Sequence, residues 1–175
     1  AAKEQVESLG AKFIMVEDEE TQNSETSGGY AKEMSEAYKK KQSQLIAETI
    51  SKQDIVICTA LIPGKPAPIL VSEEMVDTMA PGSIVVDLAV EAGGNCALSK
   101  LGEIVTHNGV KIIGHANVPG RVAKDASTLY AKNIINFLSL FIKKDEKKID
   151  IDWNDEIIKA VVLTHNGELK LEEYK

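Results

Sequence analysis

The sequence predicts an α/β fold built on a doubly wound parallel sheet, of which this chain supplies a portion. Two apolar runs carry the prediction. Asp54–Thr59 (DIVICT) and Ser83–Val90 (SIVVDLAV) are continuous rather than alternating, as in parallel strands that are buried on both faces. Segments with apolar residues at helical spacing lie before and after these runs. This repetition of helix and strand is typical of doubly wound folds.

The N-terminal region predicts a helix, a strand, a loop and a second helix. Residues 1–10 have helical spacing and end at Gly10, a residue suited to a helix C-cap. Lys12–Val16 (KFIMV) predicts a short buried strand, and residues 17–29 an acidic loop that is longer than most connections. Apolar residues recur at spacings of three and four over residues 30–52, which predicts a long helix.

The middle of the chain predicts a shaped loop, a short helix and a pair of strands. Three prolines and a glycine within residues 60–70 (ALIPGKPAPIL) indicate a loop of fixed shape. Ser72 is expected to cap a short helix that carries two glutamates in its first turn. Residues 104–106 and 111–114 predict short strands that meet at the Asn108-Gly109 turn.

The C-terminal region predicts a long amphipathic helix over residues 125–143 and then a hairpin. Residues 149–171 hold two alternating stretches, the second of which is centred on Asn166-Gly167, a dipeptide that favours tight hairpin turns. We therefore expect residues 1–124 to belong to the parallel-sheet domain. Residues 125–175 are expected to form a helix and hairpin that pack on a second lobe.

Composition excludes several classes of function. The 175-residue chain has a net charge of -7 and a pI near 5.1, which argues against the basic face that nucleic-acid binding needs. No apolar stretch reaches the roughly 18 residues of a membrane span. Cys58 and Cys96 form neither a zinc motif nor a disulfide framework, so a reducing compartment is expected. The chain opens on a helix without a start methionine, which suggests a piece of something longer.

Ligands of doubly wound sheets bind at the carboxyl ends of the strands, and three loops fall there. The first, through Gly28-Gly29-Tyr30, is either a surface connector or a lid, since paired glycines permit hinge motion and tyrosine offers a flat face that could cover an adenine. The second, Thr59–Gly64 (TALIPG), is either a proline-shaped turn or a backbone wall beside a cofactor. The third, EAGGNC, carries Glu91, a solvated or hydrogen-bonded acid or, alternatively, a general base.

Other polar residues have plainer interpretations. His107 and His165 lie beside Asn-Gly turns, and His115 is interpreted as a satisfied structural histidine. Arg121, the single arginine, could contact a phosphate, a carboxylate or a partner domain. Asp87, inside a buried strand, is expected to hydrogen-bond a neighbouring loop. The sequence has no Ser-His-Asp order, metal-ligand spacing, P-loop or GxGxxG, so no catalytic residue and no metal ligand is assigned.

Four ordered stretches carry a resemblance to a known family: ETSGGYAKEM, TALIPGKPAP, VDLAVEAGGNC and GHANVPGRVAKDAS. They are similar to the NAD(H)-binding domain in the alpha subunit of proton-translocating nicotinamide nucleotide transhydrogenase, and the similarity runs over nearly the whole chain. It implies a Rossmann-type cleft and an NAD(P)⁺ transhydrogenase of the Si-specific/Re-specific type. Hydride would pass between NAD(H) here and NADP(H) on a separate domain, coupled to proton translocation.

The resemblance also implies site residues. ETSGGYAKEM matches the family's mobile loop, which closes over NAD(H), with Gly29 and Tyr30 at its tip and Gly28 beside them. TALIPG matches the cofactor-side wall, which places Thr59, Ala60, Leu61 and Pro63 near the NAD. The implied mechanism is transfer by proximity, without an acid–base residue.

Implied partners are a second copy in a homodimer, the NADP-binding domain or beta subunit, and a membrane domain. The implied location is peripheral, on the cytoplasmic side of the bacterial inner membrane or the mitochondrial matrix side. The family's glycine-rich βα turn, ribose-binding acid and nicotinamide loop are expected upstream of Ala1. Alanine dehydrogenase is the alternative; it shares the Pro-Gly loop and the DxAxxxGG pattern, but has aspartate at Glu91 and lacks GGYAKEM.

Overall fold

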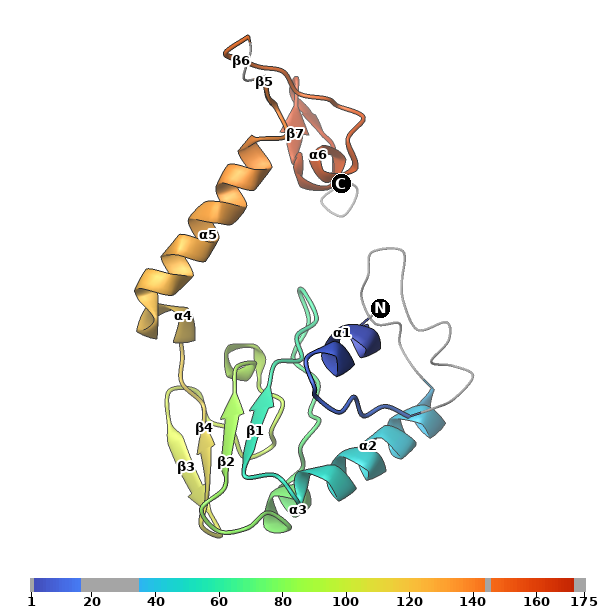
Figure 1. Ribbon diagram of the computed structural model, residues 1–175, viewed down its shortest axis with the longest axis vertical. Helices are drawn as coiled ribbons and strands as arrows, with labels where there is room; N and C mark the ends of the chain where they lie inside the picture. Colours follow the sequence, from blue (N-terminus) through green and yellow to red (C-terminus); the bar gives the residue numbers. More distant parts are fainter. Residues whose placement is uncertain (1, 17–34, 144–145, 172–175) are drawn as a thin grey trace. The chain divides into compact units, whose positions relative to one another are not determined.

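A computed structural model describes residues 2–16, 35–143 and 146–171. The chain divides into two compact units, Ala1–Val118 and Pro119–Lys175, and each is described by itself. Figure 1 shows the order of the elements in each unit. Within the described residues, no helix combines the length and the apolar character that crossing a membrane requires.

The first unit is built on a four-stranded sheet. Its order is β1 (Ile55–Cys58), β2 (Ile84–Asp87), β4 (Val110–Ile113) and β3 (Ile104–His107). β1, β2 and β4 run parallel, and β3 pairs antiparallel with β4 at the other edge. The α/β class with a parallel sheet, predicted from the continuous apolar runs, is confirmed.

Three helices accompany this sheet (Figure 1): α1 (Ala2–Ser8), α2 (Glu36–Ile50) and α3 (Glu73–Asp77). Ser35 caps α2 by accepting a hydrogen bond from the Tyr38 N–H at 3.2 Å. Ser72 caps α3 in the same way, as predicted, accepting from the Met75 N–H at 3.3 Å. Both caps satisfy N–H groups that a helix leaves without a partner at its start.

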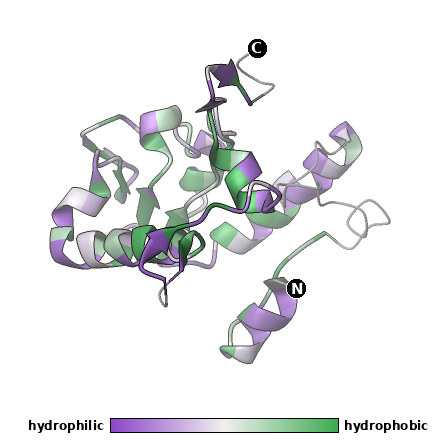
Figure 2. Ribbon diagram, turned by 90° about the horizontal axis from the view of Figure 1, so that it is seen from above, coloured by the Kyte–Doolittle hydropathy of each residue, from purple (hydrophilic) through white to green (hydrophobic). Residues whose placement is uncertain are grey.

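The core lies against one face of the sheet. Val85 and Ile112 are paired across neighbouring strands and are fully buried, and Val76 of α3 packs with them. The C-terminal half of α2 adds Ile46 and Ile50 to this cluster, and Figure 2 colours that half of the helix more hydrophobic than its start. This packing fixes the strands whose ends carry the candidate site.

Two sequence predictions fail in this unit. β1 is not buried on both faces: Ile55 and Ile57 are 62% and 63% exposed, because β1 is an edge strand and its second face has no covering element among the described residues. The predicted strand Lys12–Val16 has no regular structure, since no described strand offers it the ladder of hydrogen bonds that defines a strand. The acidic loop lies outside the described residues.

The predicted turn between β3 and β4 is confirmed. Asn108 and Gly109 both have positive φ, 48° and 81°, as a two-residue hairpin of this kind requires. His107 lies beside the turn, and its Nε2 is 2.7 Å from Asp77 Oδ1 of α3. The same carboxylate oxygen accepts a hydrogen bond from Asn108 Nδ2 at 2.7 Å, so α3 is tied to the hairpin.

The second unit contains the long helix α5 (Ala123–Leu138), preceded by the short α4 (Val118–Arg121) that starts at the division between the units. The predicted helix over 125–143 is therefore correct in kind, but it ends five residues early. α5 ends in a turn at Ser139, and the chain then enters a short strand. Phe137 and Phe141 pack edge to face across this turn, with ring centroids 5.0 Å apart.

The tail differs from the predicted hairpin. β5 (Ile142–Lys143) pairs with β6 (Lys148–Ile149), and β7 (Thr164–His165) pairs with β8 (Glu168–Leu169) around the predicted Asn166-Gly167 turn. The turn is thus confirmed. The first alternating stretch does not pair with the second, because α6 (Glu156–Val161) lies between them. Asp155 starts α6 by accepting hydrogen bonds from the N–H groups of Ile157 and Ile158.

Candidate functional site

The carboxyl ends of β1, β2 and β4 lie at one edge of the sheet because these three strands are parallel (Figure 1). Three connections start there: residues 59–70, 88–98 and 114–117. They include two of the three loops predicted to bind a ligand. The third, with Gly28, Gly29 and Tyr30, lies outside the described residues.

The loop after β1 presents its side chains to solvent. Leu61 and Ile62 are 55% and 47% exposed, although both are large and apolar. Thr59 and Pro63 are exposed as well, whereas Ala60 is half-buried. A backbone hydrogen bond from the Lys65 N–H to the Ile62 carbonyl, 3.1 Å, closes a turn inside the loop. The loop therefore offers a shaped, partly apolar surface at the sheet edge.

Asp87, the last residue of β2, is 1% exposed and organises the loop that follows it. Its Oδ1 accepts from the Ala89 N–H at 3.0 Å. Its Oδ2 accepts from the backbone N–H groups of Asn95 and Cys96 at 2.8 and 3.0 Å, and from Ser99 Oγ at 2.7 Å. Four donors thus satisfy one buried carboxylate. The prediction that Asp87 bonds a neighbouring loop is confirmed.

Asn95 connects this arrangement to the loop after β1. Its side chain is fully buried, and its Oδ1 accepts from the Ala60 N–H at 2.9 Å. Its Nδ2 donates to the Ala60 carbonyl at 2.9 Å and to the Pro68 carbonyl at 2.8 Å. One amide group therefore holds both the start and the end of the proline-containing loop.

Glu91 lies in the short 3-10 helix η2 (Val90–Ala92) and is exposed. Its Oε2 accepts a hydrogen bond from the backbone N–H of Asn117 at 3.1 Å. Asn117 follows β4 and has a positive φ of 47°. The interpretation of Glu91 as a hydrogen-bonded surface acid is borne out by this contact, which links the loops after β2 and β4.

His115 corrects one expectation. The sequence favours a satisfied structural histidine, yet the Nδ1 atom of His115 is buried and has no hydrogen-bond partner within the portion of the chain that the structure describes. The residue follows β4 at the same sheet edge. Arg121, at the end of α4, is exposed.

The two thiols lie beneath the loops. Cys58 and Cys96 are both free and buried, 7% and 1% exposed. Burial raises the pKa of Cys58 to about 12, with a smaller contribution from the negative charge of Asp87. Burial also raises the pKa of Cys96. Both groups are therefore protonated and weakly nucleophilic at neutral pH. Across the described ranges, no cluster of three or more potential metal ligands occurs.

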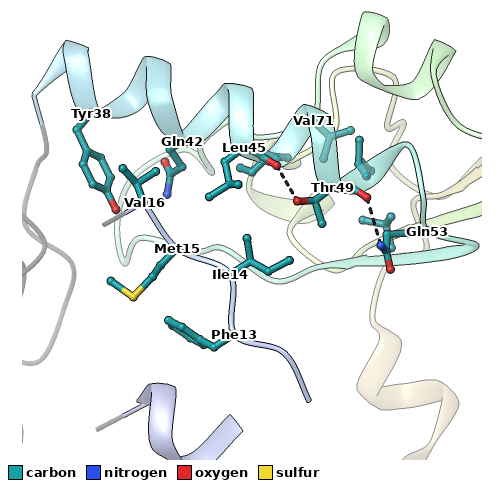
Figure 3. Close-up of a pocket in the computed structure, with 13 residues that line it drawn as sticks. Phe13, Ile14, Met15, Val16, Tyr38, Gln42, Leu45, Thr49, Gln53 and Val71 are labelled. Atoms are coloured by element: carbon teal, nitrogen blue, oxygen red, sulfur yellow. Dashed lines mark hydrogen bonds between the residues drawn. The ribbon is translucent and has the colours of Figure 1, made fainter. Parts of the chain in front are cut away.

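A pocket of about 520 Å³ lies away from this edge, between residues 13–16 and α2 (Figure 3). No charged side chain lines it among the described residues. The hydroxyl of Thr49 already donates to the Leu45 carbonyl, and Gln53 donates to the Thr49 carbonyl. Its lining suits apolar packing and offers nothing to hold the phosphates of a nucleotide.

The sheet edge therefore fits one portion of a dinucleotide site. The exposed apolar side chains of Leu61 and Ile62 could pack against a flat ring, and Thr59 offers a hydroxyl beside them. The Asp87–Asn95 hydrogen bonds hold the backbone beneath these side chains in place. A glycine-rich turn for the pyrophosphate is not found between any strand and helix of the described residues.

Comparison with known proteins decides the family. Residues 1–172 match the family model described as the C-terminal domain of alanine dehydrogenase/PNT. The chain belongs to this family. The resemblance noted from the four sequence stretches is thereby confirmed, including its relation to both transhydrogenase alpha subunits and alanine dehydrogenases.

Relatives within this family are of both kinds. The chain is 57% identical, over 95% of its length, to an NAD(P) transhydrogenase alpha subunit from Rhodospirillum rubrum, and covers 44% of that protein. It matches the crystal structure of a transhydrogenase from Sinorhizobium meliloti with a TM-score of 0.70 and 50% identity, covering 96% of this chain and 42% of that one. Alanine dehydrogenase from Lysinibacillus sphaericus is 38% identical over 61% of this chain and 30% of its own.

The chain thus spans less than half the length of these relatives. Among the predicted site residues, the structure brings Thr59, Ala60, Leu61 and Pro63 together in one loop, and their contact with NAD(H) stays a prediction. Sequence reasoning missed Asn95 as the residue that holds this loop. The signal was available: an amide directly after Gly93-Gly94, following a strand that ends in a buried aspartate.

Proposed function

We propose that this chain belongs to the NAD(H)-binding domain of a proton-translocating NAD(P)⁺ transhydrogenase. Hydride passes between NADH held here and NADP⁺ held on a separate domain, and this transfer is coupled to proton translocation. The observation that carries the proposal is the 57% identity to a transhydrogenase alpha subunit over 95% of the chain. The arrangement of two predicted ligand loops at one sheet edge supports it.

The chemistry belongs to the cofactor: a nicotinamide ring supplies and accepts the hydride. The residues of this chain bind and orient. Thr59, Ala60, Leu61 and Pro63 form a wall for the nucleotide, and Gly28, Gly29 and Tyr30 close over it. Such a mechanism works through proximity and exclusion of water and needs no acid–base pair. The exposed, hydrogen-bonded Glu91 and the protonated thiols of the site are consistent with this requirement.

The partners follow from the same proposal. A second copy forms a homodimer, and an NADP-binding domain or beta subunit meets the nicotinamide side of the site. A membrane domain carries the protons. The chain then lies peripherally, on the cytoplasmic face of a bacterial inner membrane or on the matrix face of a mitochondrial one.

The test uses the subunit at the full length of its relatives, since this chain covers 44% of the Rhodospirillum rubrum subunit. The subunit is mixed with an NADP-binding domain, NADH and NADP⁺, and NADPH is separated from NADH by chromatography and quantified. NADPH that forms only when both proteins are present supports the proposal. No NADPH above the level of either protein alone overturns it.

Alanine dehydrogenase is the second candidate function, because a relative with that name is 38% identical over 61% of the chain. The same full-length subunit is incubated with NAD⁺ and L-alanine, and NADH is followed by its absorbance. NADH formation that depends on L-alanine, without transfer to NADP⁺, would assign the dehydrogenase activity instead.

A further inference from the structure

Asn95 has no exposed atom and uses its whole side chain to hold another loop. Its Oδ1 accepts from the Ala60 N–H, and both hydrogens of Nδ2 are donated, one to the Ala60 carbonyl and one to the Pro68 carbonyl. The three distances lie between 2.8 and 2.9 Å. A side chain with three good hydrogen bonds to backbone groups fixes that backbone strongly.

The backbone of Asn95 is fixed in turn. Its N–H donates to Asp87 Oδ2 at 2.8 Å, and its carbonyl accepts from the N–H groups of Leu70 and Val71 at 2.8 and 3.0 Å. Asp87 is the last residue of β2, which is an inner strand of the sheet. The position of Ala60 is therefore referred, through one side chain, to a buried strand.

The loop has few other attachments. Between residues 59 and 66, the backbone hydrogen bond from Lys65 to Ile62 is internal to the loop and does not join it to the sheet. The side chains of Leu61, Ile62 and Pro63 are exposed and add little packing. In the described residues, the Asn95 amide makes the contacts that tie Ala60 to the sheet edge.

We propose that Asn95 is a positioning residue for nucleotide binding: it holds the Thr59–Leu61 backbone in the shape that receives NAD(H), without touching the cofactor. This inference rests on the proposed function. Removal of the amide leaves the N–H and carbonyl of Ala60 and the carbonyl of Pro68 without partners, so the loop adopts other shapes and only a fraction of molecules can bind.

The test is Asn95→Ala in the full-length subunit, with Val110→Ala as the control. Val110 is fully buried in β4 and belongs to the apolar core cluster, so its truncation lowers stability by a core defect alone. NADH binding is measured by fluorescence, stability by thermal unfolding, and transfer to NADP⁺ by its KM and kcat. Asn95→Ser is made in parallel as a milder change in case the alanine variant does not fold.

We expect Asn95→Ala to weaken NADH binding about tenfold and to raise the KM for NADH by the same factor. The kcat at saturating NADH should stay within about twofold of the wild type, because the bound loop has the native shape. Val110→Ala should keep the wild-type affinity at an equal or larger loss of stability. Unchanged affinity in both Asn95 variants, or an equal loss of affinity in Val110→Ala, would overturn the inference.

The two proposals fail in different ways. If the wild-type subunit binds no NADH, the proposed function fails, and the role of Asn95 in binding fails with it. Hydrogen exchange at the Ala60 amide reports separately on the attachment of the loop, and it should be faster in Asn95→Ala than in Val110→Ala. If the wild type binds NADH and the Asn95 variants bind equally well, only the inference about Asn95 is wrong.

Discussion

Gly94 lies directly against the carboxylate of Asp87: a Cβ atom at Gly94 would fall 2.8 Å from Asp87 Oδ2 and 3.3 Å from Ser99 Cβ. Gly94 also has a φ of +88°, which L side chains rarely adopt. The close approach is what lets Asp87 collect its hydrogen bonds from the backbone of residues 95 and 96. The glycine pair of the motif is thus explained at its second member by contact with a buried acid.

This contact predicts that Gly94→Ala destabilises the fold strongly. The added methyl group meets the Asp87 carboxylate and the backbone is strained, so we expect the free energy of unfolding to fall by about 2–4 kcal/mol. Gly93→Ala is the matched control: its φ is +105°, but nothing lies within 4 Å of the added atom. That variant should lose only about 1 kcal/mol. Urea unfolding of both variants makes the comparison, and equal losses would contradict the steric explanation.

The proposed lid predicts an effect on nucleotide retention. Tyr30→Ala in the full-length subunit should weaken NADH binding about three- to tenfold, because a ring that covers the nucleotide is removed. Gly29→Ala should act in the same direction by stiffening the hinge. Tyr130, 68% exposed on α5, serves as the control, and Tyr130→Ala should bind NADH normally. An unchanged affinity and transfer rate in the Tyr30 variant would exclude a lid role.

Cys58 predicts a loss of stability at high pH. Its pKa is raised from 9.0 to about 12 by burial, so the folded state keeps a proton that the unfolded state loses above pH 9. The stabilisation is complete below pH 9 and is lost as the pH rises from 9 towards 12. Chemical unfolding at pH 7.5, 9 and 10.5 should show a steeper decline for wild type than for Cys58→Ala. Parallel declines would mean that other groups cause the alkaline effect.

The same burial predicts slow chemistry at the thiols. Both cysteines should react with iodoacetamide far more slowly at pH 8 in the native chain than in concentrated urea, because they are buried and protonated. Intact mass after alkylation counts the modified thiols. Rapid modification of either cysteine in the native chain would show that the loops around it open readily.

The second unit predicts a helix cap at Asp155. Its Oδ1 accepts from the N–H groups of Ile157 and Ile158 at 2.8 and 3.1 Å. Asp155→Ala should lower stability by about 1 kcal/mol, whereas Asp155→Asn should retain most of it, since asparagine caps helices equally well. Circular dichroism during thermal unfolding measures both variants. Equal losses in the two would indicate that the charge rather than the cap matters.

The elements that the sequence predicted well are those set by local chemistry. Ser72 before two glutamates defined the start of α3, and Asn108-Gly109 defined the β3–β4 turn. The apolar runs at β1 and β2 identified the strands because burial of a parallel sheet demands them. The failures depend on contacts between distant segments: Ile55 and Ile57 are exposed because of where β1 falls in the sheet order, which the run itself does not encode.

The candidate site divides in the same way. The position of the loop after β1 at the sheet edge followed from the rule for parallel strands. Asp87 was recognised because an acid inside an apolar run needs donors. The role of Asn95 could not be predicted, because its three hydrogen bonds join residues 27 and 35 positions away. The prediction for His115 was wrong because whether a buried ring finds a partner depends on the backbone around it.

The exposed face of β1 has a practical consequence for handling this chain by itself. Ile55 and Ile57 share one face of the last strand of the sheet, next to backbone groups that no described strand pairs. Such an edge is a template for strand addition between copies. Light scattering by concentrated solutions should therefore grow with time, and Ile57→Lys should slow that growth by placing repelling charges on the edge.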